Sequence, residues 1–87
     1  ADAALEDAHT LDLGGRLAQR LLEEAGDSTS VTLTQTEIAR RIGASREKVN
    51  RKLHEWVDEG WISMGRAGIK LVARDQLQAL IKEARAT

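Results

Sequence analysis

The order of hydrophobic and polar residues along the chain predicts four helices and one small β-hairpin. Apolar residues recur three and four positions apart in four stretches, as on the buried face of a helix. After Gly60 the period changes to two, and a glycine-rich turn at residues 65–68 divides this alternating segment, as in a hairpin. The predicted helices cover residues 12–25, 34–42, 45–59 and 75–85, the predicted hairpin covers residues 61–72, and residues 31–33 form a short β-like run. This order predicts a mainly α fold of the α+β class.

Residues at the helix ends support these boundaries. Asp12 is the expected N-cap of the first helix. Thr34 and Glu37 have the spacing of a capping box, in which each side chain bonds the other residue's backbone N–H. Ser45 is the expected N-cap of the third helix. Gly60 is placed to end that helix with a left-handed cap, which would pack Trp61 against the last helical turn.

The second and third predicted helices are joined by a turn of two or three residues. Such a short turn makes the two helices cross at a steep angle, about 90–120°. Ala39 is small enough to allow the close crossing, Gly43 supplies the turn, and Val49 fills the corner. These features predict a helix-turn-helix, and with the hairpin they predict a winged helix-turn-helix over residues 11–87. Residues 1–10 are then a tail or the stub of an upstream helix.

The third predicted helix has an apolar arc beside a polar arc. Arginine can donate two hydrogen bonds to guanine, glutamate can accept one from the cytosine amino group, and asparagine can pair with adenine. A glutamate within a basic helix favours base recognition over simple attraction to phosphate. The alternative is a solvated helix face on which the glutamate balances its neighbours. The expected DNA base contacts are Arg46, Glu47, Asn50 and Arg51.

Charge is distributed unevenly along the chain. The net charge is −1, yet residues 40–52 hold six basic residues and one acidic residue. Such a local basic surface is what a DNA-binding domain requires. The expected DNA phosphate contacts are Thr34, Thr36, Ser45, Lys48, Lys52 and Arg66, with Arg40 and Arg41 as further candidates. For Thr34, a role in helix capping alone explains the residue equally well. For Arg66, an exposed surface position without a DNA contact is an equally good explanation.

Other kinds of chemistry find little support in the sequence. There is no cysteine, which excludes disulfides, thiolate metal sites and thiol nucleophiles and fits a reducing compartment. His9 has no metal ligand four residues later and His54 has only Asp58 there, so we expect no metal site, and no catalytic constellation is visible. No apolar run approaches the length of about 20 residues that crosses a bilayer. The chain begins at Ala1 instead of Met, so we expect a piece of a longer protein.

The segment LTQTEIARRIGASREKVNRKL (residues 33–53), followed by EGWI (59–62), resembles the C-terminal DNA-binding domain of the cyclic-AMP receptor protein family of bacterial regulators. That family includes the fumarate-nitrate regulators. LGGRLAQRLL (13–22) is similar to the first helix of that domain, and GASREKVNR (43–51) is the most specific part of the match. The resemblance covers roughly residues 11–73.

This resemblance implies a winged helix-turn-helix that joins through a hinge, near Asp12, to a dimerisation helix and an effector-sensing domain. It implies that Arg46 and Arg51 contact guanines and Glu47 a cytosine in a TGTGA-like half-site, with Thr34 and Thr36 on phosphate. Lys48 and Lys52 depart from the residues more common in the family.

The resemblance also implies a bacterial transcription regulator, which is not an enzyme, in the cytoplasm on the nucleoid. The expected partners are double-stranded DNA with a palindromic operator and a second copy of the intact protein, and RNA polymerase is a further candidate. We expect no cofactor in this segment, because a cyclic nucleotide or other effector is implied only for the absent N-terminal domain. The rival interpretation is a winged-helix module that binds a protein partner and makes no base-specific DNA contact.

Overall fold

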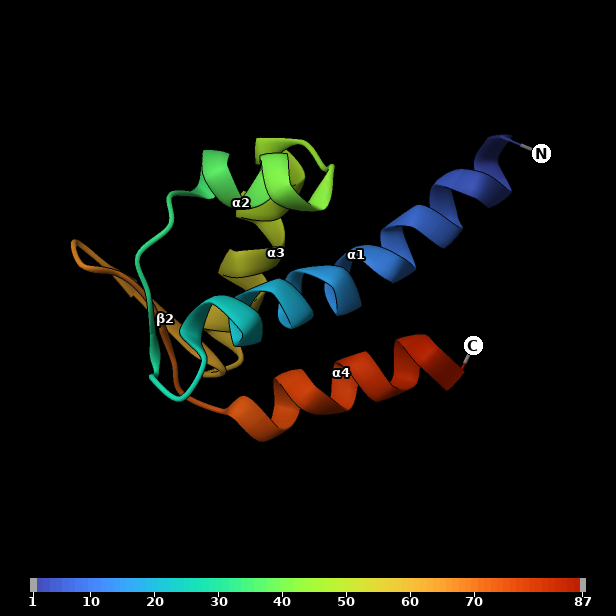
Figure 1. The fold of residues 1–87 in the computed structure, drawn as a ribbon. Helices are drawn as coiled ribbons and strands as arrows, with labels where there is room; N and C mark the ends of the chain where they lie inside the picture. The colour runs from blue at the N-terminus through green and yellow to red at the C-terminus, as the bar shows by residue number, and fades with distance from the viewer. Residues whose placement is uncertain (1, 87) are drawn as a thin grey trace.

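A helical pair and a compact helix-turn-helix unit make up the fold. The computed structural model describes the backbone of residues 2–86 and the side chains of residues 13–83. Helices α1 and α4 pack side by side, and the helix-turn-helix and the hairpin lie at the end of the molecule away from both termini (Figure 1). The elements are α1 (Asp2–Ala25), β1 (Ser30–Val31), α2 (Gln35–Ile42), α3 (Arg46–Asp58), β2 (Ile62–Gly65), β3 (Gly68–Leu71) and α4 (Arg74–Ala86). The predicted fold class, a winged helix-turn-helix, is confirmed.

Helix α1 begins much earlier than the sequence pattern predicted. It runs without a break from Asp2 to Ala25, so Asp12 lies inside the helix and its predicted N-cap role is wrong. Residues 2–11 include three alanines and two leucines and contain no glycine or proline, so helix propensity carries the helix through them. The domain boundary expected between residues 10 and 11 falls within the continuous helix α1, and the division of the chain at that point stays a prediction.

A third strand joins the hairpin. The three antiparallel strands have the order β1-β3-β2, and Ile69 of β3 lies between Val31 of β1 and Met64 of β2. The sequence predicted the hairpin, but the β-like run expected at residues 31–33 is a strand only at Ser30–Val31, and its pairing with the hairpin was not predicted. Gly68 permits this pairing, because its φ is +114° and a Cβ atom there would collide with the backbone of Val31.

One hydrophobic core joins all four helices and the sheet. Val57 and Val72 depart from the predicted pattern, with exposed fractions of 37% and 59%. Val57 lies at the edge of the apolar arc in the last turn of α3, which explains its exposure. Among the helices that the structure describes, none has the length and apolar character needed to cross a membrane. The most deeply buried side chains are Leu17 and Leu21 of α1, Ile38 of α2, Val49 and Leu53 of α3, Leu77 of α4 and Val31 of β1.

The C-terminal end of α3 has the cap that the sequence predicted. Gly60 has a φ of +79°, and its N–H donates to the carbonyl of Val57 at 3.0 Å. The N–H of Trp61 donates to the carbonyl of Trp56 at 2.9 Å, which completes a Schellman motif. The two tryptophan rings pack together with their centroids 6.3 Å apart. This cap fixes the point where the chain leaves α3 and enters the hairpin.

Candidate nucleic-acid interface

The turn between α2 and α3 has the predicted construction. Gly43 ends α2 with a left-handed conformation, φ +70°, which glycine adopts without strain. The N–H of Ala44 donates to the carbonyl of Ala39 at 3.0 Å and closes the turn. Ala39 and Val49 are both buried where the helices meet. The turn therefore holds the N-terminal end of α3 rigidly against α2.

Ser45 starts α3 as predicted. Its hydroxyl accepts a hydrogen bond from the backbone N–H of Lys48 at 3.2 Å, which is the N-cap interaction. The cap satisfies one of the free N–H groups of the first turn and sets the orientation of the residues that follow. Ser45 is exposed, so its remaining hydrogen-bonding capacity faces solvent.

The polar arc of α3 is accessible. Arg46, Glu47 and Arg51 are exposed and Asn50 is half-buried, whereas the adjacent apolar arc lies in the core. Glu47 and Arg51 are four residues apart, a spacing that often produces an ion pair on a helix. Within residues 13–83, no ion pair or hydrogen bond ties the side chains of Arg46, Glu47 or Arg51 to another residue. Their hydrogen-bonding groups are therefore open to a ligand.

Thr34 and Glu37 form the capping box at the start of α2. The Thr34 hydroxyl donates to Glu37 Oε1 at 3.0 Å and accepts from the backbone N–H of Glu37 at 3.1 Å. The backbone N–H of Thr34 and then its hydroxyl, with smaller contributions from Arg41 and Arg40, lower the pKa of Glu37. Helix capping alone therefore explains the hydrogen bonds of the Thr34 hydroxyl. The capping box also places the Glu37 carboxylate at the N-terminus of α2. Phosphate contact by Thr34 stays a prediction.

The other residues expected at phosphate differ in their surroundings. Thr36, Lys48 and Arg66 are exposed, and Arg66 lies in the turn of the hairpin. The Lys52 ammonium instead pairs with Glu55 at 3.0 Å, and 26% of the Lys52 side chain is exposed. Sequence reasoning missed this pair, although the three-residue spacing on a helix was a signal for it. A phosphate at Lys52 would have to compete with Glu55.

The two adjacent arginines of α2 also differ. Arg41 Nη1 lies 3.7 Å from Glu24 Oε1 of α1. Arg40 is exposed, and the part of the chain with described side chains offers it no ion pair. The sequence alone did not separate these two residues, because the partner of Arg41 is on a different helix.

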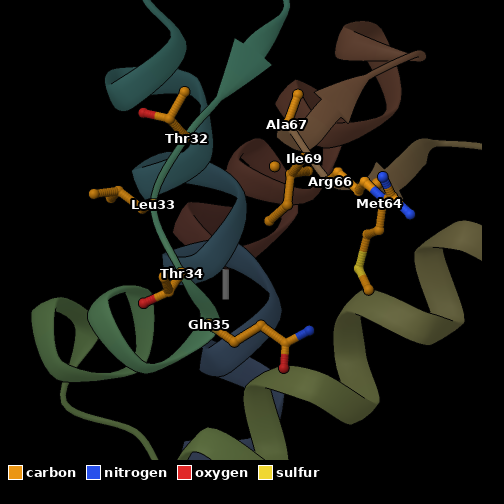
Figure 2. Close-up of a pocket in the computed structure, with 10 residues that line it drawn as sticks. Thr32, Leu33, Thr34, Gln35, Met64, Arg66, Ala67 and Ile69 are labelled. Atoms are coloured by element: carbon orange, nitrogen blue, oxygen red, sulfur yellow. The ribbon is translucent and has the colours of Figure 1, made fainter.

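A groove lies between the start of α2 and the hairpin. Its volume is about 250 Å³, and residues 32–35 and 64–69 line it. Figure 2 shows Thr32 and Leu33 on one side and Arg66 and Ala67 on the opposite side. The groove therefore separates the tip of the hairpin from α2, and the hairpin projects beside the helix-turn-helix. Among the described side chains, no group of three His, Cys, Asp or Glu residues could hold a metal ion.

Comparisons with known proteins agree with this architecture. Residues 15–80 match the model of the Crp-like helix-turn-helix domain. The chain is 42% identical over 69 residues, 69% of the chain and 31% of the relative, to a CRP-like cAMP-activated global transcriptional regulator of Mycobacterium tuberculosis. This relative is a transcriptional regulator.

Solved structures show the same fold. The catabolite activator protein of Thermus thermophilus matches 97% of this chain and 40% of its own chain, with a TM-score of 0.78 and 26% identity. The reduced, Fe(II) form of the CO-sensing protein from R. rubrum matches 90% of this chain and 40% of its own, with a TM-score of 0.74 and 30% identity. This chain thus spans less than half the length of these proteins. It belongs to the family of Crp-like helix-turn-helix domains, the DNA-binding domains of transcription regulators.

Proposed function

We propose that this domain binds double-stranded DNA in a sequence-specific manner, with α3 in the major groove of a TGTGA-like half-site. A major groove is wide enough for one α-helix, and each base pair presents a distinct pattern of donors and acceptors there. In this arrangement Arg46 and Arg51 contact guanines, Glu47 accepts a hydrogen bond from a cytosine amino group, and Asn50 contacts a neighbouring base.

The observation that carries this proposal is the open polar arc of α3. Arg46, Glu47 and Arg51 are exposed, and no partner within residues 13–83 consumes their hydrogen-bonding groups. The buried opposite arc and the Ser45 cap hold the helix that carries them. Base recognition requires such rigidly placed and unpaired donors and acceptors.

Phosphate contacts would orient the domain on the duplex. Thr36, Ser45, Lys48 and Arg66 are exposed around α3 and in the hairpin, where the backbone of a bound duplex would run. Thr34 and Lys52 contribute less in this proposal, because Glu37 and Glu55 already bind their polar groups. Such contacts fix register without reading sequence.

The intact protein would bind as a dimer to a palindromic operator. Two copies of α3 would enter successive major grooves, about 34 Å apart. A single domain would bind more weakly, because it lacks the gain in effective concentration from the tethered second copy. We further propose that the intact protein acts with RNA polymerase on the DNA of a bacterial cytoplasm.

A gel-shift experiment tests the proposed function. The 87-residue chain is titrated into a TGTGA palindrome and into a scrambled duplex of equal length and composition, at two salt concentrations. We expect tighter binding to the palindrome at both salt concentrations and weaker binding to both duplexes at higher salt. Equal affinity for the two duplexes would contradict specific recognition.

The same titration tests the rival, a protein-interaction module. An interface core for a protein partner favours exposed apolar or aromatic residues. The large exposed apolar residues of the described chain, Val57 and Val72, lie at the C-terminal end of α3 and beyond β3, away from residues 46–51. No binding to either duplex at low salt would favour the rival.

A further inference from the structure

We propose that the adjacent arginines of α2 have different roles, with Arg40 contacting the DNA phosphate backbone and Arg41 joining α2 to α1. This inference rests on the proposed function and adds one phosphate contact to it. Both residues are exposed cations within one turn of the same helix, so charge and sequence position do not separate them. The two arginines differ in the residues that surround them in the folded domain.

Arg41 faces α1. Its Nη1 lies 3.7 Å from Glu24 Oε1, and the same oxygen lies 3.5 Å from Arg20 Nη1. Arg41 and Ile42 line a groove of about 310 Å³ together with residues 16, 19, 20 and 23 of α1. Glu24 thus lies between two guanidinium groups and offsets part of the charge of Arg41, whose guanidinium is held on the side of α2 that faces α1.

Arg40 points to a different side of α2. Successive helical residues are rotated by about 100°, so Arg40 projects away from the α1-facing side that carries Arg41 and Ile42. Thr36 and Arg40 are four residues apart and lie one above the other on the same face. This face leads from the N-terminal end of α2 to Gly43 and the start of α3. Within the described part of the chain, Arg40 forms no ion pair.

A duplex bound by α3 would pass along this face. In a helix-turn-helix the second helix enters the major groove and the first helix crosses the phosphate backbone. The outer face of α2, with Thr36 and Arg40, is then the part of that helix nearest the backbone. A long arginine side chain that forms no ion pair with any described residue can donate to phosphate there without breaking such a pair.

Two matched substitutions test the division. Arg40→Ala and Arg41→Ala remove the same charge from neighbouring positions, and Arg40→Lys keeps the charge. The dissociation constant of each 87-residue variant is measured by fluorescence anisotropy on the TGTGA palindrome and on the scrambled duplex at several salt concentrations. Thermal unfolding of each variant is followed by tryptophan fluorescence.

We expect Arg40→Ala to reduce the salt slope by about one and to weaken binding to both duplexes about eightfold at 0.1 M salt. Arg40→Lys should retain the slope. Arg41→Ala should change the affinity for DNA by less than about twofold, because the Arg41 guanidinium already pairs with Glu24 of α1. The loss of this ion pair should lower Tm by roughly 2 to 4 °C.

Equal loss of affinity in Arg40→Ala and Arg41→Ala would overturn the division, because it would show that only overall charge matters. An unchanged salt slope in Arg40→Ala, with normal binding by the unsubstituted chain, would also overturn it while leaving the proposed function intact. If the unsubstituted chain binds neither duplex, the proposed function fails, and this inference fails with it.

Discussion

The backbone N–H of Thr34 donates to Glu37 Oε1 at 3.2 Å while the backbone N–H of Glu37 donates to Thr34 Oγ1 at 3.1 Å. This reciprocal bonding satisfies two N–H groups at the start of α2 that the helix itself cannot satisfy. It also makes the stability of the helix-turn-helix depend on one carboxylate being ionised.

The first prediction concerns the pH dependence of that stability. The N–H of Thr34, followed by its hydroxyl, lowers the pKa of Glu37 in the folded chain. A carboxyl whose folded pKa is depressed stabilises the fold above its unfolded pKa, and this contribution is lost as pH falls through the folded pKa. Glu37→Gln should therefore reduce the loss of stability on acidification below about pH 4.5, the ordinary pKa. Urea unfolding followed by tryptophan fluorescence at a series of pH values measures this.

Glu47→Gln is the matched control for Glu37→Gln. It removes an exposed carboxylate from the first turn of α3, where the structure shows no cap bond to that side chain. If both variants flatten the acid side of the stability profile equally, the capping box is not the cause of the Glu37 effect.

Local sequence relationships predicted the ends of α2 and α3 and the set of α3 side chains that share an exposed face, whereas the DNA contacts assigned to those side chains stay predictions. The capping box at Thr34, the cap at Ser45 and the Gly60 cap that packs Trp61 on Trp56 all depend on residues within five or six positions of one another. The polar arc of α3 was predictable for the same reason, because helical periodicity alone decides which residues share a face.

Relationships between distant residues were not predictable from the pattern. The pairing of Val31 with Ile69 and the ion pair of Arg41 with Glu24 depend on how separate elements pack. The true start of α1 was missed because no chemical signal marks it, and Asp12 offered a false one within a continuous helix. At the site, the packing of α1 on α2 separated Arg40 from Arg41.

The second prediction contrasts two glycines. At Gly68, φ is +114° and an added Cβ would collide with the backbone of Val31, so Gly68→Ala should destabilise the fold by about 2 kcal/mol or more. At Gly14, inside α1, an added Cβ would meet no described atom of another part of the chain within 4 Å. Gly14→Ala should therefore stabilise the domain by about 0.5–1 kcal/mol through helix propensity. Urea midpoints of the two variants measure both effects, and a loss of stability in Gly14→Ala would contradict the predicted free space.

The third prediction concerns Arg74 at the start of α4. Its guanidinium donates to the carbonyl of Ser28 at 2.7 Å and to the carbonyl of Gly26 at 2.9 Å. These bonds tie α4 to the loop that follows α1, so Arg74→Ala should cost about 1–2 kcal/mol of unfolding free energy. Lys82→Ala removes an exposed cation from the same helix and should change stability by less than about 0.5 kcal/mol. Similar losses in the two variants would show that helix charge, and not the clamp on the loop, is responsible.

The fourth prediction separates base contact from phosphate contact on α3. Arg46 and Lys48 are both exposed in its first turn, so Arg46→Ala and Lys48→Ala remove equal charge from nearly the same place. Arg46→Ala should cost about 1–3 kcal/mol on the TGTGA palindrome and should narrow the difference in affinity between the palindrome and the scrambled duplex. Lys48→Ala should weaken both duplexes alike and lower the salt slope by about one. Dissociation constants on both duplexes, measured across a range of salt concentrations, distinguish the two effects.

The comparison depends on keeping α3 intact in both variants. The Ser45 hydroxyl bonds the backbone N–H of Lys48, which alanine retains, so neither substitution removes the N-cap. Circular dichroism and the urea midpoint should therefore match the unsubstituted chain within about 0.5 kcal/mol. Equal losses of affinity for Arg46→Ala on the palindrome and the scrambled duplex would then assign Arg46 to the phosphate backbone, because a base contact would make the loss depend on sequence.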